Sequence, residues 1–395
     1  AAYLKDWGVI LVMVKRMKKV RGGDEKVLQK KEELQNDSWK SLVRPEIDDI
    51  SPYVPGKPIQ EVKEELGLEE VIKLASNENP LKTSSKVRQA IEKEIANINL
   101  YPDGASRSLV SDLAEKHDVD ENMILCGNGS DGIIKLIGDA FLDRDSQVII
   151  SYPSFVEYKF IAQLTGSHII RVWMRNYQQN LDGIADACTS QTEVIFLTNP
   201  DNPTGTMITE SELDHLLSRI PDDVIVVLDE AYHEYVQSDK YPDSIEYVKH
   251  GCPVIVLRTF SKAYGLAGLR LGYAIGQPDL IEVLMKARDP FNVNRLAEKA
   301  GKAALADEEF LEKTITNNEE GKEYLYQELE RLGLEYIPTQ SNFILVNARM
   351  NSEELFEDLL QKGIIIRPGK PLGYPGHFRV TVGLPEENEA FVEAL

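Results

Sequence analysis

The stretch DVIVVLDEAY, residues 223–232, decides the fold class of this chain of 395 residues. After Asp223 it has a run of valine, isoleucine and leucine, which is followed at once by two acids. A short β-branched run bounded by polar residues is typical of a strand buried on both faces of a sheet. Such a strand ends near Leu228, so Asp229 stands at its carboxyl end.

Five further apolar runs of this kind follow one another between residues 120 and 260, separated by amphipathic, helix-like segments. Strands that alternate with helices in this way predict an α/β fold, in which helices cover a mostly parallel sheet. The further runs are MILC (123–126), QVIIS (147–151), HIIRVWM (168–174), EVIFL (193–197) and PVIVL (253–257).

The C-terminal part of the chain has longer helical patterns, followed by strand-like pieces such as SNFILVN and HFRVTVG. This order predicts a second, smaller α+β domain, completed by part of residues 38–90. We therefore expect an extension of unknown role (1–37), an N-terminal arm with part of the small domain (38–90), a large domain (91–290) and a small C-terminal domain (291–395).

The composition excludes several classes of function. The formal net charge of −21 argues against nucleic acid as the main partner. The apolar run WGVILVMV (7–14) is too short to span a bilayer, so we expect no membrane contact. Cys126, Cys188 and Cys252 form no CxxC motif, and the histidines form no HExxH motif, so no metal site is expected. A reducing, cytoplasmic location fits three scattered cysteines.

Polar or glycine-containing segments follow most of the apolar runs. Because ligands bind at the carboxyl ends of parallel strands, we expect these segments to share one rim of the sheet. The segments are GNGSDG (127–132), YPSF (152–155), TNPDNPTG (198–205), DEAY (229–232) and RTFSK (258–262).

The segment GNGSDG precedes a predicted helix, so its backbone N–H groups could hold a phosphate. It also matches the GxGxxG pattern of dinucleotide-binding proteins, which supports an alternative, an NAD-dependent dehydrogenase. That alternative needs an acid at the end of the next strand to hold the ribose. The next strand ends in Ser151, Tyr152 and Pro153, which weakens the alternative.

Lys262 and Asp229 suggest a different cofactor. A lysine amine can form a Schiff base with an aldehyde, and a carboxylate can pair with a protonated ring nitrogen. Together with a phosphate cradle, these are the protein groups that pyridoxal 5'-phosphate uses. Ser261 and Arg270 add a hydroxyl and a guanidinium for the phosphate.

From about Val43 to its end, the chain resembles the histidinol-phosphate aminotransferase family of fold-type I enzymes. The resemblance implies a mostly parallel, seven-stranded sheet and the conversion of L-histidinol phosphate and 2-oxoglutarate to imidazole-acetol phosphate and L-glutamate, in histidine biosynthesis. Segments that carry the resemblance are RPEIDDISPYVPGKPI, IKLASNENP, YPDGASRSL, GNGSDGIIKLIGDAF, TNPDNPTG, VVLDEAY, RTFSKAYGLAGLRLGYAIG, PFNVN, SNFILVN and FRVTVG.

The same resemblance implies a role for each matching residue. Lys262, Asp229 and Tyr232 would be catalytic, with Lys262 as the cofactor lysine and Asp229 as the partner of the pyridine nitrogen. Asn202 and Tyr232 would bind the ring hydroxyl oxygen, and Phe155 would stack on the ring. The phosphate would be held by Ser130, Asp131, Ser261 and Arg270, and by Tyr101 of the neighbouring subunit in a homodimer.

Arginines of the C-terminal domain would bind the substrates. Arg379 resembles the arginine that holds the anionic end of family substrates, and Arg367 resembles a second one near the substrate phosphate. Asn77 and Asn79 would line the entrance of the pocket. Two alternatives stay open within the superfamily: an aromatic amino acid aminotransferase, or one of dual specificity, and a threonine-phosphate decarboxylase.

Overall fold

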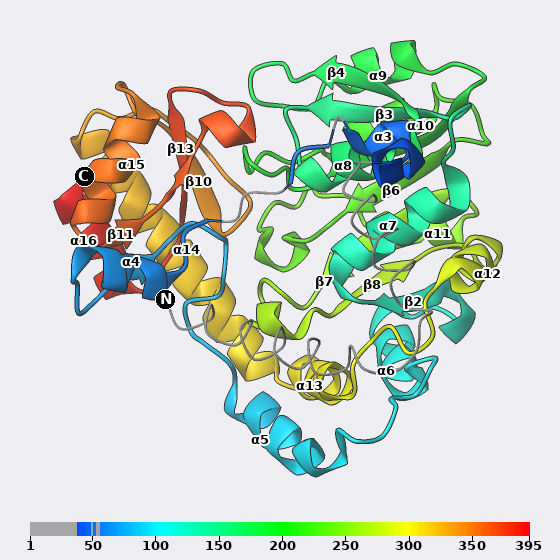
Figure 1. Cartoon of the computed structure of the whole chain (residues 1–395), viewed down its shortest axis with the longest axis horizontal. Coiled ribbons are helices and arrows are strands. Elements are labelled where there is room, and N and C mark those ends of the chain that lie inside the picture. Colours follow the sequence, from blue (N-terminus) through cyan, green and yellow to red (C-terminus); the bar gives the residue numbers. More distant parts are fainter. Residues whose placement is uncertain (1–37, 49, 53–55) are drawn as a thin grey trace, which may run out of the picture. The chain divides into compact units, whose positions relative to one another are not determined.

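The computed structural model describes residues 38–48, 50–52 and 56–395 (Figure 1). The chain divides into an N-terminal unit that ends at Ile50 and a compact unit from Ser51 to Leu395. In the N-terminal unit the described residues form η2 (Ser38–Leu42) and α3 (Pro45–Asp48). The predicted extension at residues 1–37, with its apolar run, lies outside the described residues.

A seven-stranded sheet dominates the second unit, in the order β2-β8-β7-β6-β5-β3-β4. Six strands are the predicted apolar runs and run parallel to one another, which confirms the predicted fold class. The prediction lacks β8 (Gly272–Ile275), a four-residue strand antiparallel to both neighbours. The six parallel strands are β2 (Ile124–Gly127), β3 (Gln147–Tyr152), β4 (His168–Trp173), β5 (Thr192–Thr198), β6 (Ile225–Asp229) and β7 (Val254–Thr259).

Helices cover both faces of this sheet, because successive strand side chains point to opposite faces. In β6, Ile225 and Val227 pack on one side, while Val226 and Leu228 pack on the other. The first side, called the α7–α8 face below, is covered by α7 (Gly129–Phe141), α8 (Val156–Thr165) and α12 (Pro278–Ala287). The opposite face is covered by α5 (Ser85–Glu94), α6 (Arg107–His117), α9 (Leu181–Ala187), α10 (Glu210–Leu217), α11 (Ser244–Lys249) and α13 (Arg295–Leu305).

Two smaller sheets stand beside the large one in the second unit (Figure 1). An antiparallel sheet has the order β12-β13-β10-β9, and β1 (Ile72–Lys73) pairs in parallel with β11 (Ile364–Ile365). A separate apolar core joins these strands to the helices around them. Their bounds are β9 (Tyr336–Ile337), β10 (Phe343–Asn347), β12 (Arg367–Pro368), β13 (His377–Thr381), α4 (Ile59–Leu66), α14 (Glu308–Arg331), α15 (Ser352–Gln361) and α16 (Pro385–Ala394).

Short 3-10 turns complete the second unit: η3 (Ile95–Asn97), η4 (Glu121–Met123), η5 (His233–Tyr235), η6 (Ala267–Leu269) and η7 (Lys370–Leu372). Among the helices that the structure describes, none is both long enough and apolar enough to cross a bilayer.

Candidate active site

Most of the candidate residues lie on loops that follow the carboxyl ends of strands in the large sheet. β5, β6 and β7 are parallel, and β2 runs in the same direction because β2 and β7 are both antiparallel to β8, so the carboxyl ends of these four strands lie at the same end of the sheet. Asp229 is the last residue of β6, and Lys262 lies three residues beyond the end of β7. The predicted common rim is confirmed by this pairing.

The start of α7 is suited to an anion. Its N-cap residue, Asn128, makes no side-chain hydrogen bond to the helix, so the N–H groups of the first turn have no side-chain cap. Arg270 lies beside this turn, with Nη2 2.7 Å from Oδ2 of Asp131 and Nη1 3.5 Å from Oγ of Ser261. Gly129 cannot be replaced without a shift, because a Cβ there would lie 2.6 Å from Nη2 of Arg270. Backbone amides, a hydroxyl and a guanidinium therefore converge as a phosphate requires.

Lys262 has the environment of a reactive amine. Its Nζ donates to the carbonyl oxygen of Ser76 at 3.4 Å and lies 5.7 Å from the ring centre of Tyr232. Burial, helped by the charge of Arg379, lowers the pKa of Lys262 to about 8. A fraction of this amine is therefore neutral near pH 7 and able to attack a carbonyl group.

Asp229 and Glu230 are neighbours in sequence but face opposite sides of the sheet. Asp229 follows the alternation of Ile225 and Val227, toward the α7–α8 face. Glu230 points to the other side, where its carboxylate pairs with Arg258 through contacts of 2.9 and 2.8 Å. The charge of Glu230 is thus balanced by Arg258, whereas Asp229 lies at the rim without such an arginine partner among the described residues.

The Asp229 carboxylate is 2% exposed. Its Oδ2 accepts the Tyr158 hydroxyl at 2.7 Å, and its Oδ1 accepts the Ala231 backbone N–H at 3.2 Å. Burial raises the pKa of Asp229 to about 6, while the Tyr158 hydrogen bond opposes that rise. Asp229 is therefore an anion at neutral pH, as a partner for a protonated ring nitrogen must be.

Tyr232 receives two amide donors on its hydroxyl oxygen: Nδ2 of Asn77 at 2.9 Å and Nδ2 of Asn202 at 3.2 Å. The orientation of the Asn202 amide follows from Arg379, whose Nη1 donates to its Oδ1 at 2.5 Å. With both acceptor positions filled, the Tyr232 hydrogen is left to be donated elsewhere. Burial also raises the pKa of Tyr232 to about 12, so the phenol keeps that hydrogen.

Arg379 and Arg367 lie directly opposite each other on neighbouring antiparallel strands, β13 and β12. Residues paired in this way share one face of the sheet, and like charges there repel each other. Arg379 is 6% exposed; its Nη2 donates to the carbonyl oxygen of Ala75 at 2.9 Å, and its guanidinium lies 5.1 Å from the ring centre of Phe343. An anion bound between the two guanidiniums would relieve their repulsion.

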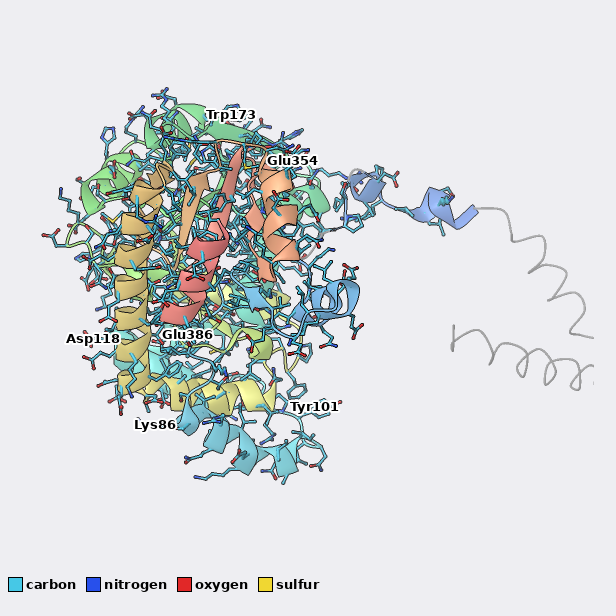
Figure 2. All side chains as sticks on the ribbon, turned by 90° about the vertical axis from the view of Figure 1, so that its left-hand side faces the viewer. Lys86, Tyr101, Asp118, Trp173, Glu354 and Glu386 are labelled. Carbon is cyan, nitrogen blue, oxygen red and sulfur yellow. The ribbon has the colours of Figure 1, made fainter. Side chains whose placement is uncertain are left out.

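The remaining candidate residues lie on α7, at the start of α8 and on segments outside the large sheet. Ser130 is buried at the start of α7. Phe155 is the N-cap residue of α8, with its ring 5.6 Å from that of Tyr158. Asn79 donates to Ala263 and Thr314, whereas Asn77 is 1% exposed. Tyr101 is 78% exposed and lies near α5 and α13 (Figure 2).

Comparison with known proteins identifies the family. Residues 69–395 match the family described as aminotransferase class I and II. A histidinol-phosphate aminotransferase from Moorella thermoacetica is 48% identical over 347 residues, which cover 88% of this chain and 90% of that protein. Histidinol-phosphate aminotransferase 1 from Idiomarina loihiensis is 43% identical over 354 residues, 90% of this chain and 96% of that protein.

The chain belongs to the histidinol-phosphate aminotransferases, within the class I and II aminotransferases. The crystal structure of the Sinorhizobium meliloti histidinol-phosphate aminotransferase in complex with pyridoxal-5'-phosphate superposes with a TM-score of 0.81 at 25% identity. The match covers 89% of this chain and 96% of that one. The predicted resemblance is confirmed, and the alternative of an NAD-dependent dehydrogenase is excluded.

Pyridoxal 5'-phosphate is the cofactor of this aminotransferase family, and the residues present fit it. The uncapped start of α7 suits the phosphate, the amine of Lys262 suits the aldehyde, and the anion of Asp229 suits the pyridine nitrogen. Across the described part of the chain, no group of three or more histidine, cysteine or acidic side chains is arranged to hold a metal ion.

Two residues beside Asp229, Tyr158 and Thr198, are absent from the predicted site residues. Thr198 is the last residue of β5 and pairs with Asp229 in the register of the sheet, in agreement with its place in the predicted rim segment TNPDNPTG. Tyr158 has no such signal, because a tyrosine on the buried side of a helix reads as an ordinary core residue. Only the packing of α8 on the sheet brings its hydroxyl to Asp229.

Proposed function

We propose that the chain transfers the amino group of L-histidinol phosphate to 2-oxoglutarate, forming imidazole-acetol phosphate and L-glutamate, in histidine biosynthesis. The observation that carries the substrate assignment is the arginine pair on β12 and β13. A guanidinium binds a phosphate or a carboxylate through the same planar fork, so one pair can serve both substrates in turn. The two relatives named as histidinol-phosphate aminotransferases support the assignment.

Both arginines would act on the phosphate of histidinol phosphate, which is the only anionic group of that substrate. Arg379 would hold the anionic end of each substrate in turn, and Arg367 would be a second arginine near the substrate phosphate. Asn77 and Asn79 would line the entrance of the pocket, where Asn77 bonds to Tyr232 and Asn79 bonds to the backbone beside Lys262.

Pyridoxal phosphate, when bound, supplies an electrophilic aldehyde and a ring that accepts the electrons left at the substrate carbon. Lys262 would hold the aldehyde covalently. Asp229 would keep the ring nitrogen protonated, and Tyr232 with Asn202 would bind the ring hydroxyl oxygen. Phe155 would stack on the ring. The phosphate would be held by Ser130, Asp131, Ser261 and Arg270.

Proton transfer would fall to Lys262. Once the substrate amine has displaced it, its Nζ is a free base that can remove the proton from the substrate Cα and return it to the neighbouring cofactor carbon. The lowered pKa supports this role, because an amine with a pKa of about 8 both accepts and releases a proton near neutral pH. Arg379 would fix the substrate so that its Cα stays within reach of Nζ.

The decisive experiment compares substrates in the presence of 2-oxoglutarate. We expect kcat/KM for histidinol phosphate to exceed that for histidinol and for phenylalanine by about 100-fold or more, since a buried site built to bind a phosphate discriminates against analogues without one. Arg367→Met should remove most of this preference while leaving kcat for phenylalanine within a few-fold. Equal kcat/KM for phenylalanine would instead favour an aromatic aminotransferase, and release of carbon dioxide a decarboxylase.

We further propose a homodimer, in which Tyr101 reaches the cofactor phosphate of the partner subunit. Tyr101 stacks on Phe291 with ring centres 4.7 Å apart, and both rings are exposed. Ile95, Ile98 and Leu100 add apolar side chains that are 55–63% exposed on the same segment. A patch of this kind is typical of a surface that another protein covers.

Tyr101→Phe tests the shared site. Loss of one hydrogen bond to a charged phosphate should weaken cofactor binding about tenfold. Mixing this variant with Lys262→Ala, which carries an intact Tyr101, should restore tight sites in the mixed dimers. A monomer in sedimentation, or unchanged cofactor affinity in Tyr101→Phe, would count against the proposal.

We also propose a cytoplasmic location. The three cysteines carry free thiols, in keeping with a reducing compartment.

A further inference from the structure

Tyr158 lies on α8, and its hydroxyl contacts the last residues of β5 and β6. Its ring stacks on Phe196 of β5, with ring centres 4.8 Å apart and planes 9° from parallel. Thr198 and Asp229 are partners in the register of β5 and β6, and both point to the α7–α8 face from which Tyr158 descends. With its ring stacked on Phe196, Tyr158 therefore places its hydroxyl against Thr198 and Asp229.

The direction of the hydrogen bonds follows from the chemistry of the three groups. An ionised carboxylate only accepts, so the Tyr158 hydroxyl donates to Oδ2 of Asp229 at 2.7 Å. The single hydroxyl hydrogen of Tyr158 is already donated to Asp229, so Thr198 is the donor in the contact of 2.9 Å between the Thr198 and Tyr158 hydroxyls. Both hydroxyls thus point their hydrogens toward the carboxylate, an arrangement in which each bond strengthens the next.

We propose that Tyr158 is a positioning residue for catalysis: supported by Thr198, it holds the Asp229 carboxylate anionic and in place for the ring nitrogen of the cofactor. This inference rests on the role proposed for Asp229. A carboxylate that is 2% exposed pays for its burial unless hydrogen bonds stabilise the charge, and Tyr158 donates the shortest hydrogen bond that it receives.

Other charges also act on Asp229. Asp131, at the start of α7, raises the pKa of Asp229, and Lys262, beyond β7, lowers it. Burial has the largest effect and favours the neutral acid, whereas Tyr158 gives the largest opposing contribution. Without that hydroxyl the proton would shift from the ring nitrogen toward the carboxyl group.

Tyr158→Phe tests the inference in the cofactor-loaded enzyme, because it removes the hydroxyl and keeps the stacked ring. An unprotonated ring nitrogen makes the ring richer in electrons. The Lys262 nitrogen that is bonded to the cofactor should therefore keep its proton to higher pH. We expect the midpoint of the pH titration of the bound cofactor's absorbance to rise by about one unit, and kcat to fall about tenfold. KM should stay within about twofold, since no substrate contact changes.

Three further variants separate the possible causes. Thr198→Val leaves the tyrosine in place and should raise the midpoint by a smaller amount. Tyr273→Phe removes another buried hydroxyl, one that contacts His117, and should leave the titration unchanged. Asp229→Asn should raise the midpoint at least as far as Tyr158→Phe.

Each contrary result has its own meaning. A shift with Asp229→Asn and none with Tyr158→Phe or Thr198→Val would overturn the role of Tyr158 alone. No shift with Asp229→Asn would overturn the role of Asp229 in the proposed function. If Tyr158→Phe fails to fold, Thr198→Val decides the matter. An equal shift with Tyr273→Phe would mean that a general loosening of the core, and not the Tyr158 hydroxyl, moves the titration.

Discussion

Replacing Lys262 with alanine is expected to lower turnover of histidinol phosphate by about 10⁴-fold or more. One side chain would provide both the covalent anchor of the cofactor and the base at the substrate Cα, so its removal takes away two catalytic effects at once. Steady-state assays with 2-oxoglutarate measure the loss. The variant should still bind some cofactor, because the phosphate cradle at α7 and Arg270 remains.

Lys286→Ala is the matched control for this variant. Lys286 lies on α12, and its side chain is 70% exposed and pairs with Glu282 at 2.8 Å. Removing it deletes the same charge from the surface and should change turnover by less than twofold. Turnover in Lys262→Ala within tenfold of the natural chain would refute the assignment of this lysine.

Asp229→Asn is expected to reduce kcat by roughly 10³-fold. The change preserves the shape of the side chain but removes the negative charge that would stabilise a protonated ring nitrogen, an electrostatic contribution of the largest class in enzymes. Single-turnover measurements with histidinol phosphate report on the chemical step directly. A loss smaller than tenfold would contradict the proposed pairing.

The pH dependence supplies an independent check on Asp229. Its pKa of about 6 lies above the ordinary value of 3.8, so the anion forms only as the pH rises through about 6. Cofactor affinity in the natural chain should therefore fall as the pH drops below 6, and this dependence should be weaker in Asp229→Asn.

The contribution of Asp229 to folding stability should change with pH in the opposite direction to cofactor affinity. A raised carboxyl pKa means that the folded state binds the proton more tightly than the unfolded chain, so stability is lost as the pH rises from about 4 to about 6. Asp229→Asn removes this cost and should not lower the Tm of the cofactor-free protein at pH 7. Loss of activity with an unchanged Tm would separate a chemical defect from unfolding.

Much of the candidate site could be located from the sequence because its residues stand at the ends of strands. The run before Asp229 and the run before Lys262 are both continuous and β-branched, so their carboxyl ends could be placed on one rim from sequence alone. The start of α7, the proposed phosphate site, follows in the same way from a glycine-rich segment between a strand and a helix.

The parts that escaped prediction depend on packing between distant segments. β8 is short and begins at Gly272, where a Cβ would lie 2.6 Å from the backbone nitrogen of Ser130, so its identity as a strand depends on neighbours rather than on its own composition. Asn77 lies 155 positions before Tyr232, yet its amide reaches the tyrosine hydroxyl. Contacts of this range leave no local pattern.

The sequence by itself determined the fold class and the rim, and it predicted the lysine, the aspartate and the phosphate cradle, because strand ends and glycine-rich turns are local features. Only the tertiary structure decided that Asp229 faces α8 while Glu230 pairs with Arg258, that Arg367 stands opposite Arg379, and that Tyr158 reaches the carboxylate. The physical reason is that pleat, register and helix packing place side chains from remote segments side by side, and these depend on the whole core at once.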